Sequence, residues 1–192
     1  GVYEMGSVFK TFSMAMGIEH GNMTLKDSYD VSKPIRAGRF WIKDYHPYDG
    51  YYNLPEIFMH SSNIGTAKIA LDVGSQQQQS FYRELGLMDG LDVELSEKSL
   101  PLYPERWGDV STMTASYGHG IAVTPLHIAK ATSALVNGGM LYPATLLHKG
   151  KESIIGTRVV HQKTSDQVRK LLRYVVSHGT GGQAEVDRYM VG

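Results

Sequence analysis

The clearest pattern in the chain is a helical repeat of apolar residues towards residue 178. Apolar side chains recur there at intervals of three and four residues: Val168, Leu171, Leu172, Val175 and Val176. Because this spacing places them on one face of a helix, it predicts a helix over residues 165–178 that ends before Gly179. The run Thr164-Ser165-Asp166-Gln167 fits a capping box, which we expect to begin this helix.

Other segments with a helical period predict a mainly helical chain. Further helices are expected over residues 6–19, 54–61, 63–73, 76–85, 109–116 and 125–137. Gly21 is predicted to end the first helix in a left-handed conformation, and Thr124 with Pro125 to begin the last of this set. In the helix over 63–73, Leu71 is expected to be buried with the other apolar residues.

The remaining segments lack a helical period. Residues 28–52 mix apolar and polar positions with several prolines and glycines, which predicts short strands and a surface loop. Residues 140–160 are predicted to form a hairpin, and a loop should follow Gly86 through Pro101 and Pro104. Residues 117–120 are expected to form a tight loop whose glycines allow positive φ.

Composition narrows the classes of function. The 192 residues are 42% hydrophobic, enough to bury the core of one domain, and 19 Lys and Arg balance 19 Asp and Glu. Because the net charge is about zero, it does not favour binding to nucleic acid, and we do not expect nucleic acid as a partner. The absence of cysteine excludes thiolate metal sites, and the eight histidines lack zinc-motif spacing, so no metal is expected. No apolar run is long enough to predict a membrane span in this stretch.

A candidate nucleophile and base lie in the first helix. Ser7 and Lys10 are three residues apart, so on a helix both side chains point from the same face. A lysine that has lost its proton can activate a neighbouring serine hydroxyl, which is otherwise a weak nucleophile. Taken alone, the pair also fits a helix cap at Ser7 followed by a solvated lysine.

A second polar motif lies between two predicted helices. Ser61 and Asn63 form a Ser-x-Asn turn, which presents a hydroxyl and a carboxamide together. These groups can relay a proton and hold a peptide amide. The structural alternative is that Ser62 or Asn63 only caps the following helix.

These motifs resemble a known family. Ser-x-x-Lys followed by Ser-x-Asn matches, in order, two of the three signatures of the penicillin-binding transpeptidases. Residues 1–10, 61–65 and 116–126 are similar to the class B, division-specific members, through Gly-Val-Tyr-Glu-Met-Gly-Ser-Val-Phe-Lys, Ser-Ser-Asn-Ile-Gly and Ser-Tyr-Gly-His-Gly with Val-Thr-Pro-Leu. The resemblance runs over essentially the whole chain.

The resemblance implies a fold. It is the α/β penicillin-binding and β-lactamase-like transpeptidase fold, of which this chain would hold the mainly helical half, with a few short strands and the central sheet largely missing. In the family Lys-Thr-Gly follows the position of Gly192, so residues 1–192 are expected to be an internal part of one transpeptidase domain. They run from the Ser-x-x-Lys helix to just before the Lys-Thr-Gly strand, and alone they are expected to be inactive.

The resemblance also implies an activity, that of a peptidoglycan D,D-transpeptidase. Such an enzyme is a serine-type acyltransferase that cross-links D-Ala-D-Ala stem peptides in septal cell-wall synthesis and is acylated by β-lactam antibiotics. By resemblance the catalytic residues are Ser7, Lys10, Ser61 and Asn63. Asn63 is also implied to bind substrate, together with Tyr117, Gly118, His119 and Gly120.

The same resemblance implies the surroundings of the enzyme. It places the protein at the cell membrane, with the catalytic domain facing the periplasm or cell exterior and the anchor upstream of this chain. A membrane-embedded glycan polymerase and other division proteins are the implied partners, and neither metal nor organic cofactor is required.

Two alternatives to transpeptidation remain at this point. A D,D-carboxypeptidase or β-lactam-hydrolysing relative would use the same residues with water as acceptor. The other alternative is a non-catalytic fragment or scaffold, and the absence of Lys-Thr-Gly from this chain favours it. Residues 97–101 resemble the Glu-x-x-Leu-Asn segment of class A β-lactamases, whose glutamate holds a hydrolytic water. Pro101 replaces the Asn and has no side-chain amide to help hold that water. We therefore interpret Glu97 as a solvated loop carboxylate.

Overall fold

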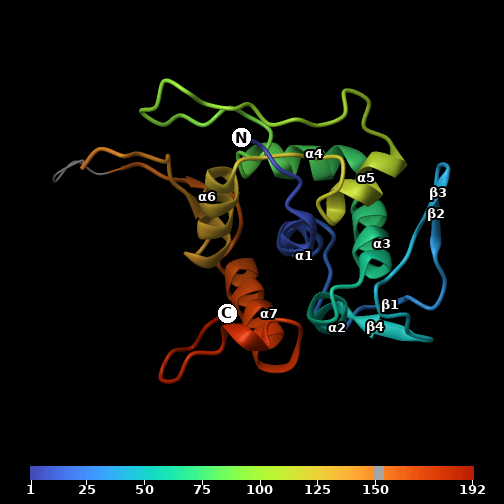
Figure 1. Ribbon diagram of the computed structural model, residues 1–192. Helices are drawn as coiled ribbons and strands as arrows, with labels where there is room; N and C mark the ends of the chain where they lie inside the picture. The colour runs from blue at the N-terminus through green and yellow to red at the C-terminus, as the bar shows by residue number, and fades with distance from the viewer. Residues whose placement is uncertain (149–153) are drawn as a thin grey trace.

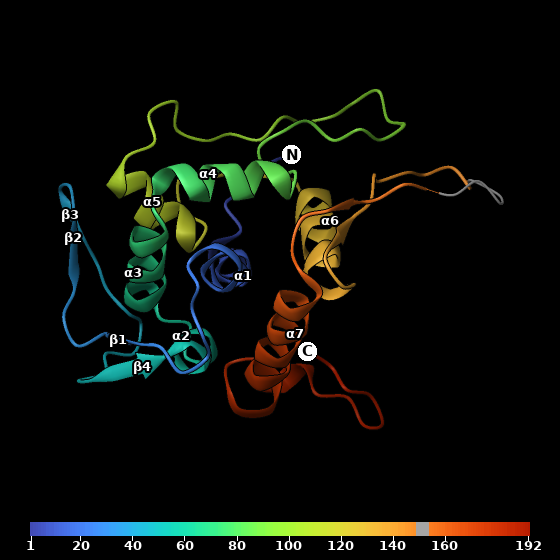
Figure 2. The same ribbon diagram turned by 180° about the vertical axis from the view of Figure 1, so that it is seen from behind.

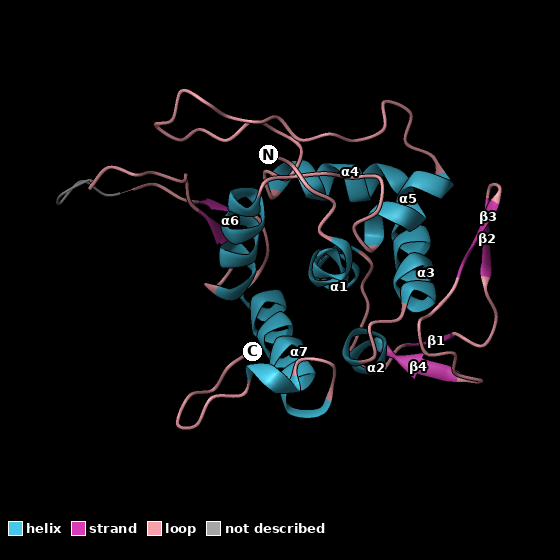
Figure 3. Cartoon of the chain, in the orientation of Figure 1, coloured by secondary structure: helices cyan, strands magenta, loops and turns pink. Residues whose placement is uncertain are grey.

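The computed structural model describes residues 1–148 and 154–192, and helices form the body of this part of the chain (Figure 3). The α-helices are α1 (Lys10–His20), α2 (Leu54–Met59), α3 (Asn63–Val73), α4 (Ser75–Glu84), α5 (Asp109–Ser116), α6 (Pro125–Val136) and α7 (Gln162–His178). Two 3₁₀ turns, η1 (Gly6–Phe9) and η2 (Gly182–Ala184), accompany them. The predicted mainly helical chain is confirmed. Within the described ranges, no helix has the length and apolar character needed to cross a membrane.

The strands are short and pair two by two. The antiparallel pairs are β1 (Ser28–Asp30) with β4 (Tyr51–Asn53), β2 (Ile35–Ala37) with β3 (Phe40–Ile42), and β5 (Met140–Leu141) with β6 (Thr157–Arg158). These pairs confirm the short strands predicted in residues 28–52 and the base of the hairpin predicted in 140–160. Residues 149–153, which the predicted hairpin includes, lie outside the described residues.

Helix α1 is the centre of the molecule. Figures 1 and 2 show it end-on from opposite sides, with the other helices arranged around it. It contacts each of α2 to α7, and every residue from Lys10 to Gly17 is buried. A helix enclosed in this way must be apolar or small on all sides rather than along one stripe. Its sequence Lys-Thr-Phe-Ser-Met-Ala-Met-Gly meets that need everywhere except at Lys10.

Buried aromatic side chains hold the first turn of α1 in place. Phe9 and Phe12 are fully buried and meet edge to face with ring centroids 5.4 Å apart. Phe9 makes the same kind of contact with the buried Tyr82 of α4 at 5.7 Å. Aromatic pairs of this geometry add about 0.5–1.5 kcal/mol beyond burial. The backbone that carries Ser7 is therefore held by rigid packing.

The capping box predicted at residues 164–167 is wrong. Helix α7 begins earlier, at Gln162, and no side chain of its own first turn caps it. The carboxylate of Glu19, on α1, accepts from the backbone N–H of His161 at 3.1 Å and from the hydroxyl of Thr164. A tertiary contact thus provides the hydrogen-bond acceptor at the start of α7 that a local capping residue was expected to provide. The same contact joins α7 to the C-terminal end of α1.

Two smaller predictions are also wrong. Gly21 follows α1 with φ of −88°, so it does not adopt the left-handed cap. Leu71 of α3 is 36% exposed, so it is not buried with the other apolar residues of that helix. By contrast, the predicted bounds of α3 and α5 are confirmed, and so is the beginning of α6, where Thr124 caps the helix ahead of Pro125.

The contact between α1 and α7 predicts the effect of removing Glu19. Glu19→Ala should lower the free energy of unfolding by about 2–3 kcal/mol, because it removes a nearly buried carboxylate that accepts several hydrogen bonds. Urea unfolding measures the change, and Glu105→Ala, at an exposed loop position, is the control. Equal stabilities of the two variants would contradict this account of the helix start.

Candidate active site

Ser7 lies on an exposed 3₁₀ turn ahead of the buried part of α1. The turn η1 runs from Gly6 to Phe9, and α1 continues from it at Lys10. Ser7 is exposed, whereas Phe9 is fully buried. The hydroxyl is therefore open to a substrate while its backbone is anchored, the arrangement that a nucleophile needs.

Lys10 reaches Ser7 through Ser61. The Lys10 ammonium donates to the backbone carbonyl of Ser61 at 2.5 Å and to Ser61 Oγ at 2.8 Å. Ser61 Oγ in turn donates to Ser7 Oγ at 3.1 Å. Among the described residues no hydrogen bond joins Lys10 directly to Ser7. The i, i+3 spacing was expected to bring the amine to the hydroxyl, and the structure inserts a second hydroxyl between them.

Burial changes the acidity of Lys10. The residue is 1% exposed, and desolvation lowers the pKa of its amine from 10.5 to about 8. The negative charge of Asp44 acts in the opposite direction and raises this pKa. Because burial dominates, the amine loses its proton more readily than a surface lysine. A usable fraction is therefore neutral, and able to accept a proton, near pH 7.

Ser61 occupies an unusual backbone conformation. It lies between α2 and α3 with φ of 54°, which is uncommon for a residue other than glycine. Such conformations cost about 1–3 kcal/mol and persist where the surroundings enforce them. Here the conformation lets Ser61 present both its carbonyl and its hydroxyl to Lys10.

Asn63 is the first residue of α3 but does not cap it. The cap is Ser62, whose Oγ accepts from the backbone N–H of Gly65 at 2.9 Å. The amide of Asn63 donates to the backbone carbonyl of Lys43 at 3.0 Å. The alternative in which Asn63 serves only as a helix cap is therefore excluded, while Ser62 does fill that role.

The loop over residues 117–120 packs directly on the turn that carries Ser7. Gly118 has φ of 79°, and a Cβ built on it would lie 2.2 Å from the backbone oxygen of Gly6. Gly120 N–H donates to Glu4 Oε1 at 2.9 Å, and His119 Nδ1 lies 3.0 Å from Glu4 Oε2. The structure thus brings Gly118, His119 and Gly120 close to the segment that precedes Ser7. Tyr117 is half-buried, and burial raises the pKa of its phenol.

Sequence reasoning missed Glu4, Lys43 and Asp44. Asp44 Oδ2 accepts from Ser62 Oγ at 2.6 Å and Asp44 Oδ1 from Ile64 N–H at 2.9 Å. These residues belong to segments without a helical or strand period, and their partners are 18 to 116 positions away. No local pattern in the sequence marks them. Glu97, interpreted as a solvated carboxylate, is exposed in the loop that follows α4.

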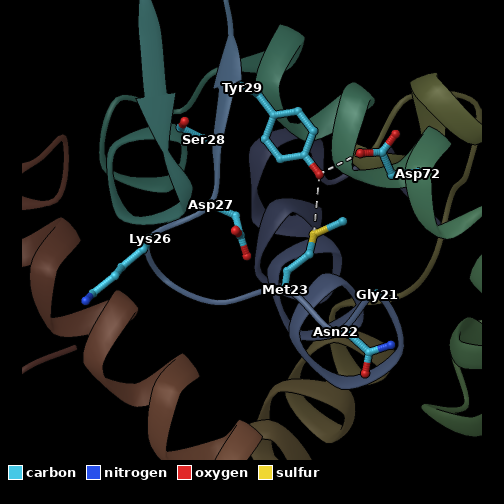
Figure 4. A pocket seen from close by; sticks show the side chains of 8 residues that line it. All are labelled: Gly21, Asn22, Met23, Lys26, Asp27, Ser28, Tyr29 and Asp72. Atoms are coloured by element: carbon cyan, nitrogen blue, oxygen red, sulfur yellow. Dashed lines mark hydrogen bonds between the residues drawn. The ribbon is translucent and has the colours of Figure 1, made fainter.

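A polar pocket of 550 Å³ lies at the other end of α1 (Figure 4). It is lined by Gly21, Asn22, Met23, Lys26, Asp27, Ser28, Tyr29 and Asp72. Across it the hydroxyl of Tyr29 donates to Asp72 at 2.8 Å. Neither Ser7 nor Lys10 nor the Ser61–Asn63 turn lines this pocket, so it is separate from the candidate active site.

The fold and the order of these motifs define the class of protein. The model of the penicillin-binding protein transpeptidase domain matches residues 1–192, and the chain belongs to this family. Two solved structures cover all of the chain at 28% identity. A peptidoglycan glycosyltransferase from Burkholderia ambifaria aligns with a TM-score of 0.93 over 62% of its chain. The transpeptidase domain of penicillin-binding protein 3 from Burkholderia pseudomallei aligns with a TM-score of 0.92 over 59%. The expected fold class is confirmed.

The chain is also similar in sequence to curated proteins. The probable peptidoglycan D,D-transpeptidase FtsI of Caulobacter vibrioides is 40% identical over 196 residues, which cover 100% of this chain and 33% of the relative. Stage V sporulation protein D of Bacillus subtilis is 32% identical over 208 residues, 99% of this chain and 32% of that protein. The chain therefore spans about a third of the length of these relatives.

The contact between Gly118 and Gly6 predicts unequal effects at two similar glycines. Gly118 and Gly120 have nearly the same φ, 79° and 74°, but a Cβ on Gly120 would meet only Thr114 Oγ1 at 3.6 Å. Gly120→Ala should cost about 1–2 kcal/mol for the left-handed backbone alone. Gly118→Ala should cost about 1–3 kcal/mol more, because its methyl group displaces Gly6. Urea unfolding compares the two, and equal losses would contradict the close contact.

The lowered pKa of Lys10 predicts a pH dependence of stability. Its pKa is about 8 when folded and 10.5 when unfolded, so between these values the folded state binds fewer protons than the unfolded state. The free energy of unfolding should therefore rise with pH across this window, by up to ~3 kcal/mol. Lys10→Met lacks this contribution. Unfolding of both proteins between pH 7 and 10.5 gives the difference, and a difference that stays constant with pH would contradict the burial of a titrating amine.

Proposed function

We propose that the protein is a serine-type acyltransferase, a peptidoglycan D,D-transpeptidase that acts in septal cell-wall synthesis. The observation that carries the proposal is the hydrogen-bond chain from the buried Lys10 through Ser61 to the exposed Ser7. It is the arrangement of base, relay and nucleophile that acyl transfer requires. The name of one relative, a probable peptidoglycan D,D-transpeptidase, supports the proposed reaction, and the septal role rests on the resemblance to the division-specific members of the family.

The direction of the hydrogen bonds fits a resting enzyme. With Lys10 protonated, the ammonium donates to Ser61 and Ser61 donates to Ser7, so Ser7 Oγ accepts rather than gives a proton. Loss of the Lys10 proton reverses this order. Ser7 then donates to Ser61, and Ser61 donates to the neutral amine. A proton can pass from Ser7 to Lys10 along this path as the nucleophile attacks.

The proposed reaction has two steps. Ser7 Oγ bonds to the carbonyl carbon of the penultimate D-alanine of a stem peptide, and the bond from that carbon to the terminal D-alanine nitrogen breaks. Lys10 takes the Ser7 proton, and Ser61 passes a proton to the departing amine. An amine of a neighbouring stem then attacks the ester, which forms the cross-link and returns the proton to Ser7.

Asn63 and residues 117–120 would hold the substrate. The Asn63 carboxamide lies two residues from Ser61, where it can orient the substrate backbone. Gly118, His119 and Gly120 flank the turn that carries Ser7 and, with the adjacent Tyr117, would contact the stem peptide. β-Lactam antibiotics, as mimics of the D-Ala-D-Ala end, would acylate Ser7. No step in this scheme uses a metal or an organic cofactor.

The family also suggests where the enzyme works. We place it at the cell membrane with the catalytic domain facing the periplasm or cell exterior, beside a membrane-embedded glycan polymerase and other division proteins. The supporting observation is the similarity to FtsI proteins over the whole chain. Co-purification of the full-length protein with such a polymerase tests this association.

Acylation by fluorescent penicillin tests the nucleophile and its base. The full-length protein should be labelled in proportion to its amount, and Ser7→Ala should not be labelled. The rate of labelling should rise with pH and level off above a midpoint near 8, because only the neutral amine of Lys10 accepts the proton. At pH 6 we expect a rate on the order of 100-fold below the plateau. Undiminished labelling of Ser7→Ala would exclude Ser7 as the nucleophile.

Product analysis separates the transpeptidase from its alternatives. A D-Ala-D-Ala stem peptide supplied with an amine acceptor should give the cross-linked dimer. Formation of the shortened peptide alone would indicate a carboxypeptidase, and hydrolysis of the β-lactam a β-lactamase-like enzyme. A protein that neither reacts with the peptide nor binds penicillin would fit the scaffold alternative.

A further inference from the structure

The turn that carries Ser61 is held by a separate segment of the chain. We call residues 43–52, which run from the end of the β2–β3 hairpin to β4, the clasp segment. Its residue Lys43 accepts from the Asn63 side chain at 3.0 Å through its backbone carbonyl. Asp44 accepts from Ser62 Oγ at 2.6 Å and from the Ile64 N–H at 2.9 Å. The three residues that follow Ser61 therefore all have partners in two consecutive residues of the clasp segment.

The clasp segment also contacts the residue that precedes Ser61. The ring of Tyr52 stacks on His60 with centroids 4.9 Å apart, and Tyr48 stacks on Tyr52 at 4.4 Å. His60 precedes Ser61 directly. The carbonyl and hydroxyl of Ser61 itself contact Lys10, and the hydroxyl also contacts Ser7.

Asp44 makes the strongest of these contacts. A carboxylate that accepts from a hydroxyl and a backbone N–H forms charge-assisted bonds, and the start of a helix favours a negative charge. Ser62 Oγ donates to Asp44 while it accepts from Gly65 N–H as the cap of α3. Asp44 thus fixes both the hydroxyl orientation of the cap and the first turn of the helix that begins beside Ser61.

We propose that Asp44 is a positioning residue for the acylation of Ser7: its carboxylate holds the Ser61–Asn63 turn so that Ser61 Oγ stays within hydrogen-bond distance of both Lys10 and Ser7. This inference rests on the proposed function, because it concerns the same reaction. Ser61 adopts φ of 54°, and this conformation persists only while the neighbouring residues enforce it. Asp44 bonds to two of those neighbours, Ser62 and Ile64.

The charge of Asp44 has a second, separable effect. Asp44 is the charged group that acts on the Lys10 amine, and it raises the pKa of that amine against the larger effect of burial. The direct partners of the ammonium are neutral oxygens of Ser61. Removal of the carboxylate charge should therefore move the pH midpoint of acylation down. A looser turn should lower the plateau rate, since misplacement by about 1 Å can cost up to about 100-fold.

Asp44→Asn in the full-length protein tests the proposal, because it keeps the size of the side chain and removes its charge. We expect a plateau rate of penicillin acylation that falls by tenfold or more, up to about 100-fold, and a midpoint at lower pH than in the wild-type protein. Asp49→Asn, at an exposed position of the same segment, is the matched control and should give the wild-type profile. Circular dichroism shows that each variant is folded at the assay temperature.

Asp44→Glu separates the two effects. It retains the charge on a longer side chain, so its midpoint should stay near that of the wild type while its plateau falls. If Asp44→Asn does not fold, Asp44→Glu still tests the proposal. A wild-type plateau rate in Asp44→Glu would overturn it. An unchanged plateau rate in folded Asp44→Asn overturns it as well. Failure of the wild-type protein to be labelled at Ser7 would instead overturn the proposed function.

Discussion

The structure depends on one buried charge-bearing side chain. Lys10 lies in the central helix where every neighbouring position is apolar or small, and its amine is almost completely removed from water. Such burial costs stability unless hydrogen bonds compensate. The compensation comes from the carbonyl and hydroxyl of Ser61. A destabilising feature of the fold is thus tied to the one residue that links Lys10 to the exposed Ser7.

The packing around α1 makes this arrangement rigid. Phe9 and Phe12 anchor the turn that carries Ser7 in the core, and Gly118 lies in close contact with Gly6. At the far end Glu19 joins α1 to the start of α7. Helix α1, which begins at Lys10, and the 3₁₀ turn with Ser7 that leads into it are therefore held by packing at each end and along their length. Under the proposed function, this preorganisation would keep Ser7 and Lys10 in place without ordering them during the reaction.

The sequence predicted what periodicity and local capping control. The bounds of α3 and α5, the start of α6 and the glycine loop at 117–120 were all visible in the pattern of residues. The order of Ser7, Lys10, Ser61 and Asn63 was enough to suggest the family. What could not be predicted depends on contacts between distant segments. Glu19 replaces the expected cap at Thr164, and Asp44 holds a turn that lies 18 to 20 residues further along.

The difference between local sequence signals and contacts of distant segments matters most at the candidate active site. Spacing placed Lys10 and Ser7 on one helix face, but the relay through Ser61 requires the positive φ of that residue and the contacts of Lys43 and Asp44 with the residues that follow it. The central claim is that Lys10 has a lowered pKa because it is buried. NMR titration of the full-length protein labelled with ¹³C at lysine Cε measures this directly, with the Lys10 signal assigned by its loss in Lys10→Met. We predict a midpoint near pH 8. A midpoint at or above the ordinary value of 10.5 would contradict the account.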